Sequence, residues 1–143
     1  MIVPDVNLLL YASDEASPHH EAALAWWSRC LAGPEVVGIP WVTTLAFLRL
    51  TTNPRVYSDP VTVEQALAVV DQWFSYPHVV ALEPTSRHLG ILSGLLRPTG
   101  AGANLVTDAH LAAVAIENGA ALCSADADFS RFPGLTWKNP LAS

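Results

Sequence analysis

The sequence is poor in cysteine, in charged residues and in long apolar segments. Cys30 and Cys123 are too few for a disulfide framework, which favours a reducing cytosol. No stretch approaches the roughly 20 apolar residues of a membrane-spanning helix. The N-terminal apolar run is interrupted by Asp5 and has no basic segment before it, unlike a signal peptide. These absences predict a cytoplasmic protein without a membrane segment.

Basic residues are also scarce. The formal net charge is -6, from 7 Lys and Arg against 13 Asp and Glu. Such a chain does not attract nucleic acid over a long range, so a nucleic-acid role would need local arginines or metal ions. Of the 143 residues, 51% are hydrophobic and 14% are charged. This balance predicts one domain, residues 1–143, with some apolar surface covered by a partner.

Short apolar strands alternate with helical patterns along the chain. Strands are expected at about 2–4, 36–39, 79–82, 120–123 and 135–137. Helices are expected at about 18–31, 41–52, 61–73, 86–96 and 104–118. A turn is expected to begin at Asp5, and a loop at 98–102. The alternation predicts an α/β sandwich around a mostly parallel sheet.

Three aspartates in distant segments are candidates for one shared site. Asp5 follows the first strand, Asp126 follows a later strand, and Asp108 lies near the start of a helix on the same face as Leu111 and Ala112. Functional groups gather beyond the carboxyl ends of parallel strands, and a crossover helix starts at that edge. Taken singly, Asp126 is also typical of an Asx turn. Asp108 taken singly is also typical of an aspartate that the helix dipole favours at a helix N-terminus. Together they predict convergence.

Converging carboxylates repel one another and raise each other's pKa unless a cation lies between them. Ligands that are all oxygen atoms suit Mg²⁺ or Mn²⁺. A site of this kind serves phosphodiester hydrolysis. We therefore expect Asp5, Asp108 and Asp126 to be metal ligands and catalytic residues.

Four stretches of the sequence form a pattern together: IVPDVNLLLYA, PWVTTLAFLRLTTNPRVY, NLVTDAHLAAVAIENGA and SADADFSRFPGLTWKNPL. With them the chain resembles the PIN-domain ribonucleases, in particular the VapC-type toxins of bacterial toxin-antitoxin modules, over nearly its whole length. The resemblance implies a three-layer α/β/α sandwich, Mg²⁺- or Mn²⁺-dependent endoribonuclease activity and a homodimer. It also implies a cognate antitoxin whose tail covers the active site, and structured RNA such as tRNA or rRNA as the substrate.

The resemblance also implies roles for individual residues. The acidic positions of the family correspond to Asp5, Asp108 and Asp126, with Asp128 as an additional metal ligand. Polar residues that orient these acids correspond to Asn7, Thr107 and Ser124. One position departs from the family, which usually has a glutamate just before a pattern like F-L-R. Ala46 stands at that position here.

Other polar residues have weaker signals. Arg55 would hold an RNA phosphate if it lay near the acidic edge. Arg97, beside the glycines of loop 100–102, would clamp the RNA backbone, although helix termination explains this segment more simply. The five histidines have no metal-ligand spacing, so structural or exposed positions are expected for His19, His20, His78, His88 and His110.

Two other functions remain open. A phosphatase of the haloacid dehalogenase type also begins with a strand followed by Asp, but it needs a D-x-D pair and a downstream lysine. The corresponding segment here is Asp5-Val6-Asn7, and the only lysine is Lys138. The missing glutamate at Ala46 motivates the other alternative, a catalytically weakened PIN module that binds RNA or a protein without cutting.

Overall fold

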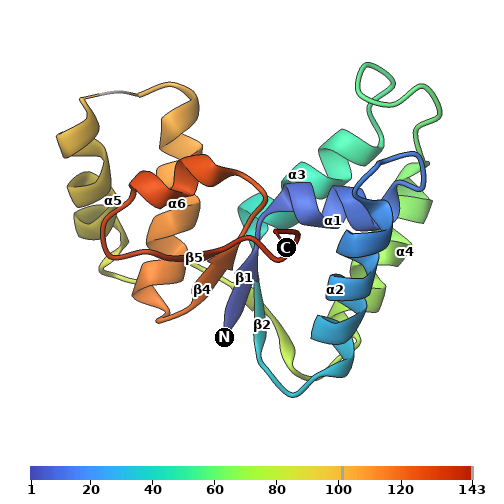
Figure 1. The fold of residues 1–143 in the computed structure, drawn as a ribbon, viewed down its shortest axis with the longest axis horizontal. Helices are drawn as coiled ribbons and strands as arrows, with labels where there is room; N and C mark the ends of the chain where they lie inside the picture. The colour runs from blue at the N-terminus through green and yellow to red at the C-terminus, as the bar shows by residue number, and fades with distance from the viewer. Residues whose placement is uncertain (101, 143) are drawn as a thin grey trace.

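The centre of the fold is a parallel sheet, which has five strands within residues 1–100 and 102–142, the part described by the computed structural model (Figure 1). The strands are β1 (Ile2–Pro4), β2 (Val37–Pro40), β3 (Val79–Leu82), β4 (Ala121–Cys123) and β5 (Thr136–Lys138). Their order across the sheet is β3-β2-β1-β4-β5, and each neighbouring pair is parallel. The predicted sandwich around a mostly parallel sheet is confirmed.

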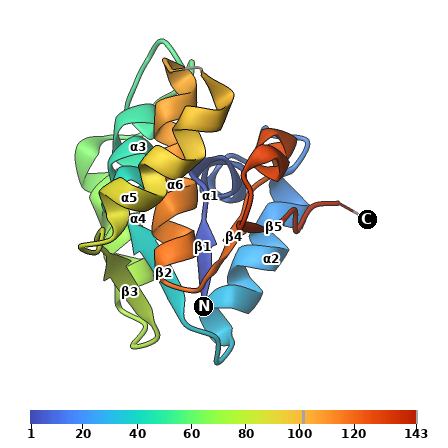
Figure 2. The same cartoon turned by 90° about the vertical axis from the view of Figure 1, so that its left-hand side faces the viewer.

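Helices cover both faces of the sheet (Figures 1 and 2). One group consists of α1 (Val6–Ser13), α2 (His20–Ala32), α3 (Trp41–Thr51) and α4 (Val63–Phe74). The other consists of α5 (His88–Leu96) and α6 (Asn104–Glu117), with the short 3-10 helices η1 (Arg97–Thr99) and η2 (Ala127–Arg131). Ile2 and Val3 belong to different hydrophobic clusters, because successive side chains of a strand point to opposite faces. No helix in the described residues is long and apolar enough to cross a bilayer.

Helix α1 is the main difference from the sequence prediction, which placed a turn at Asp5 and no helix before residue 18. The helix follows β1 directly, and Asp5 is its N-cap: the Val6 N–H donates to Asp5 Oδ1 at 2.7 Å. Leu8, Leu9 and Ala12 are buried, and the segment VNLLLYAS is apolar almost all round. A helix without a polar face has no amphipathic periodicity, so the sequence did not reveal it.

The other predicted helices and strands begin and end within two residues of their observed bounds. The predicted loop 98–102 contains part of η1, and residue 101 lies outside the described residues. Thr62 is the N-cap of α4, since the Thr62 and Gln65 side chains each accept a hydrogen bond from the other's backbone N–H.

A chain of partly buried polar groups, centred on the buried Glu117, joins α5 to α6. Nδ1 of His88, near the start of α5, donates to Oε2 of Glu117, at the end of α6, over 2.9 Å. The other ring nitrogen of His88 lies 2.9 Å from Nδ1 of His110, whose pKa is lowered chiefly by burial. The Glu117 carboxylate also accepts the Thr85 N–H at 2.7 Å. The two helices therefore run antiparallel, and α6 begins at the edge of the sheet where the strands end.

We predict that Glu117→Ala lowers the free energy of unfolding by about 2–4 kcal/mol, because the part-buried hydrogen bonds from the Thr85 N–H and from His88 then lose their acceptor. Urea denaturation measures the change. The exposed Glu83→Ala is the matched control and should shift stability by less than about 0.5 kcal/mol. Equal stability of the two variants would contradict a structural role for this chain of groups.

Candidate active site

The candidate site lies where β1 and β4 end. Asp5 directly follows β1, Ser124 directly follows β4, and the Asp5 N–H donates to the Cys123 carbonyl at 2.8 Å. The chain leaves β1 toward the helices on one face and reaches β4 from the helices on the other. The strand order therefore reverses between β1 and β4, and open α/β sheets form a crevice at such a position.

Ser124 organises the polar groups at this edge. Its side chain is fully buried, and its hydroxyl donates to Asp5 Oδ2 at 2.7 Å. The same oxygen accepts hydrogen bonds from the Asn7 side-chain amide at 3.2 Å and from the Asp126 N–H at 3.0 Å. Because Oδ1 of Asp5 is already held by the Val6 N–H, both carboxylate oxygens have fixed positions. Oδ1 of Asn7 is buried and has no hydrogen-bond partner among the described residues, which leaves an acceptor unsatisfied near Asp5.

The structure brings the predicted acids into one electrostatic field. Burial is the largest cause that raises the pKa of Asp108 on α6, and the charges of Asp126, Asp5 and Asp128 raise it further. The pKa of Asp5 is raised by burial, and the Asp126 charge adds to this, although the bonds from Ser124 and Val6 oppose the shift. Asp128 is exposed on η2 and donates its N–H to Asp126 Oδ1 at 2.9 Å. The charges of three other carboxyls, from two further segments, thus act on Asp108.

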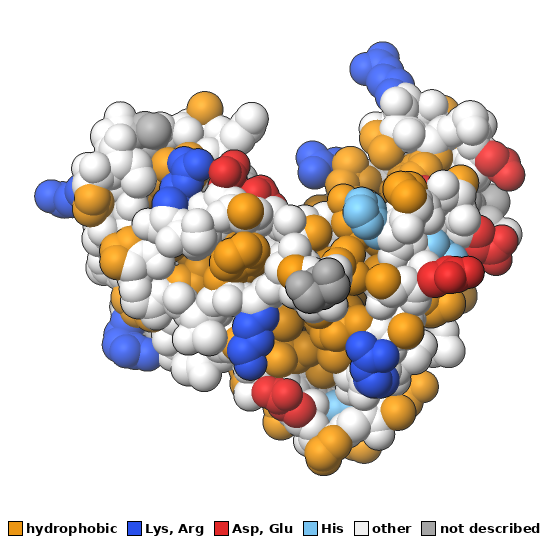
Figure 3. Space-filling view, viewed as in Figure 1, with side chains coloured by type: hydrophobic (Ala, Val, Ile, Leu, Met, Phe, Trp, Pro, Cys, Tyr) orange, Lys and Arg blue, Asp and Glu red, His pale blue; other side chains and the backbone are white. Residues whose placement is uncertain are grey.

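A small pocket of about 60 Å³ lies between α3 and α6 at this edge. Asp5, Thr107 and Asp108 line it on one side, and Val42, Thr43 and Ala46 of α3 line the other. Figure 3 shows the outline of the molecule notched between the part with α5 and α6 and the part with α3, with acidic and basic side chains beside the notch. Ala46 therefore faces the pocket, and α3 contributes no carboxylate to it.

These residues fit a divalent cation by their chemistry. Within the described residues, no group of three or more His, Cys, Asp or Glu side chains is close enough to form a preformed metal cluster. Mg²⁺ does not need one, since it binds through one or two carboxylates and keeps several waters. The donors here are oxygen atoms. The pKa of Asp5 and of Asp108 is raised chiefly by burial and further by neighbouring carboxylates, and a cation would relieve this repulsion.

Arg131 was not predicted as a site residue from the sequence. Its guanidinium Nη2 lies 3.3 Å from Asp128 Oδ1, and its charge lowers the pKa of Asp108. The spacing of three residues from Asp128 on η2 was the available signal. Arg55, in the loop after α3, and Arg97, at the start of η1, are both exposed and form no ion pair within the described part of the chain.

Comparisons with known proteins identify the family of this chain. The family model described as "PIN domain" matches residues 2–135. Ribonuclease VapC37 of Mycobacterium tuberculosis is 44% identical over 142 residues, which cover 99% of each chain. Ribonuclease VapC33 of the same species is 43% identical over 141 residues, again covering 99% of each.

Solved structures agree in fold. VapBC2 from Rickettsia felis, bound to a DNA fragment from its promoter, matches with a TM-score of 0.72 and 18% identity over 97% of this chain and 98% of that one. VapC20 of Mycobacterium tuberculosis, a toxin that cleaves the sarcin-ricin loop, matches with a TM-score of 0.67 and 20% identity over 95% and 99%. The fold is the three-layer α/β/α sandwich that the sequence resemblance implied. The chain belongs to the PIN-domain family and, within it, to the VapC ribonucleases.

Proposed function

We propose that this protein is a metal-dependent endoribonuclease, the toxin of a toxin-antitoxin pair that a cognate antitoxin neutralises. The observation that carries the proposal is that Asp5 and Asp108 both have a raised pKa, chiefly through burial, and that the charge of Asp126 raises both further at the carboxyl edge of a PIN-type sheet. We further propose structured RNA, such as tRNA or rRNA, as the substrate, a homodimer as the assembly and the cytoplasm as the location. The ribonuclease names of the relatives and the VapBC complexes among the structural neighbours support the activity and the antitoxin partner, and the VapC20 toxin, which cleaves the sarcin-ricin loop, supports a structured RNA.

The proposed roles follow from the contacts of each residue. Mg²⁺ or Mn²⁺ in this site would make water a stronger nucleophile at neutral pH and neutralise charge that develops on the phosphate. Asp5, Asp108 and Asp126 would hold the ion, with Asp128 as an additional ligand. Ser124 and Asn7 fix the orientation of Asp5, and Thr107 lies in the pocket beside Asp108.

Basic side chains must bring the RNA to this site, because the chain has a net charge of -6. Arg131 is suitably placed, since its charge already acts on Asp108 and its side chain is 46% exposed. We propose that it binds a phosphate next to the scissile bond. Arg55 and Arg97 would contact the RNA backbone further away.

Cleavage of a panel of structured RNAs tests the proposal. We expect cleavage with Mg²⁺, loss of cleavage in EDTA, and a loss of about 100-fold or more in Asp126→Asn. The exposed Asp71→Asn on α4 removes the same charge outside the site and should retain activity. Cleavage that persists in EDTA or in Asp126→Asn would exclude the proposed metal site.

The pKa of Asp5 predicts a stability effect that does not depend on activity. A carboxyl whose folded-state pKa is raised contributes stability below its unfolded pKa of about 4, and this contribution is lost as the pH rises through the folded pKa. Without metal, Asp5→Asn should therefore have a larger free energy of unfolding than the wild type at pH 7, by about 0.5–2 kcal/mol, and the difference should shrink toward pH 3. Thermal melting across this pH range measures it. A variant that is less stable than the wild type at pH 7 would contradict the prediction.

The position of Ala46 favours a second candidate function, a PIN module that binds RNA or a protein without cutting it. Ala46 lines the pocket together with Asp5 and Asp108, so the family's usual glutamate would extend into the pocket that these acids line. Without that carboxylate the site has one ligand fewer. Absence of detectable Mn²⁺ affinity at millimolar metal would favour this alternative over the ribonuclease.

Ala46→Glu tests how much the missing carboxylate matters. We expect calorimetric titration to show Mn²⁺ affinity increased by about tenfold, because affinity in such sites depends on the number of charged ligands. The same variant should be less stable without metal, since it adds repulsion. Leu45→Glu adds the same charge on the 59% exposed neighbouring position and is the matched control. If both variants bind Mn²⁺ equally well, Ala46 does not face the metal site.

A further inference from the structure

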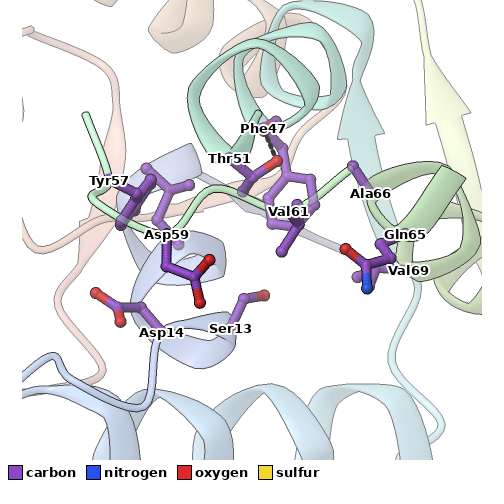
Figure 4. A pocket seen from close by; sticks show the side chains of 11 residues that line it. Ser13, Asp14, Phe47, Thr51, Tyr57, Asp59, Val61, Gln65, Ala66 and Val69 are labelled. Carbon is purple, nitrogen blue, oxygen red and sulfur yellow. Dashed lines mark hydrogen bonds between the residues drawn. The ribbon is translucent and has the colours of Figure 1, made fainter. Parts of the chain in front are cut away.

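A pocket of about 180 Å³ lies between α1, α3, α4 and the loop that joins α3 to α4 (Figure 4). None of the residues that line it also lines the pocket with Asp5 and Asp108. Figure 4 shows the Asp59 side chain pointing toward Ser13 and Asp14. Two acidic residues do not by themselves define a ligand. The contacts that lead beyond the acids at the sheet edge come instead from β5.

Strand β5 holds the backbone of Ser124 through both its N–H and its carbonyl. It lies at one end of the strand order and pairs with β4, and it contributes no acid to the site (Figure 1). The Ser124 N–H donates to the Lys138 carbonyl at 3.0 Å. The indole N–H of Trp137 donates to the Ser124 carbonyl at 3.1 Å. The residue that organises the acidic edge is therefore fixed to β5 through its backbone.

The bond from Trp137 is made by a side chain, so the packing of the indole ring determines where its N–H points. Trp137 is partly buried and packs against the hydrophobic cluster that contains Val3 and Leu122. Its partner in the ladder is Leu122, so the indole extends along β4 by two residues to reach Ser124. An indole N–H only donates, and it usually finds an acceptor when it is buried. The apolar contact of the ring thus holds this donor against the Ser124 carbonyl.

The Ser124 carbonyl belongs to the planar peptide group that joins Ser124 to Ala125, and Asp126 follows directly. Because a peptide group turns as a unit, rotation of this carbonyl would move Asp126 relative to the Ser124 hydroxyl. That hydroxyl oxygen lies 3.0 Å from the Asp126 nitrogen and 2.7 Å from Asp5 Oδ2. Both hydrogen bonds weaken steeply if the geometry is lost. A donor that fixes the carbonyl therefore fixes both acids through one residue.

We propose that Trp137 is a positioning residue of the acidic site: its indole N–H holds the Ser124 carbonyl, and Ser124 in turn sets the places of Asp5 and Asp126. The kinetic consequence rests on the proposed ribonuclease function, whereas the effect on the backbone does not. Small displacements of the groups that hold a metal or a reacting phosphate lower activity while the fold is kept. A packing role would need the ring of Trp137 but not its N–H.

Two variants separate the N–H of Trp137 from its ring. Site-specific replacement of Trp137 by 3-benzothienylalanine puts a sulfur atom in place of the N–H and keeps the shape of the ring. Trp137→Phe removes the donor together with part of the ring. Trp26→Phe is the matched control, because Trp26 is a buried residue of α2 that does not line the pocket with Asp5 and Asp108.

Amide hydrogen exchange measures the effect on the backbone without metal or substrate. The Asp126 N–H should exchange at least about fivefold faster in both Trp137 variants than in the wild type, because its acceptor on Ser124 is held less firmly. The Thr85 N–H, which is bonded to Glu117 at the end of α6, should exchange at the wild-type rate. Trp26→Phe should leave the exchange of the Asp126 N–H unchanged.

Cleavage kinetics and Mn²⁺ titration measure the effect on the site. In both Trp137 variants we expect kcat to fall at least about fivefold while KM for RNA stays within about twofold, because the arginines proposed to bind phosphate are not altered. Mn²⁺ should bind at least about threefold more weakly, since its ligands are less well positioned. Trp26→Phe should keep the wild-type kcat and Mn²⁺ affinity.

An unchanged exchange rate of the Asp126 N–H in the benzothienylalanine variant would overturn the proposal, since the ring alone would then suffice. A fall in kcat that is equal in Trp26→Phe and Trp137→Phe would also overturn it and would assign the effect to lost packing. Failure of the wild type to cleave any RNA would contradict the proposed function instead, and the exchange rates would still decide the role of Trp137.

Discussion

The hydrogen bond from the Ser124 hydroxyl to Asp5 is the interaction on which the acidic edge depends. It joins the ends of β1 and β4 across 119 residues of sequence. The hydroxyl is buried, so the bond is made where water does not compete, and it holds an acid whose burial disfavours its charge. Because the same oxygen accepts the Asp126 N–H, the first and last parts of the site are positioned by one side chain.

Much of this architecture was accessible from the sequence, and the exceptions have physical reasons. Strand and helix alternation predicted the sheet, and strand ends predicted the places of Asp5 and Asp126. Helix α1 was missed because it is apolar all round, and only its tertiary surroundings make it a helix. Arg131 was missed because its effect on Asp108 acts through space between η2 and α6.

The pocket of about 180 Å³ between α1, α3 and α4 could not be predicted from sequence patterns. Asp14 ends α1 and Asp59 lies in the loop before α4, and an acidic residue at either position does not by itself indicate a site. Only the packing of α1, α3 and α4 places them at one end of an apolar space. The departure at Ala46 is the opposite case: the sequence resemblance identified it, and the structure shows which pocket the missing side chain would have entered.

Helix α1 connects the acidic edge of the sheet with the pocket between α1, α3 and α4. Asp5 is its N-cap and Asp14 its C-cap, and the eight residues between them form a rod of about 12 Å. A short helix with no internal break moves as a rigid body, so a shift along its axis displaces both carboxylates together. Asp5 at the sheet edge and Asp14 at the far end of α1 are therefore held at a fixed separation.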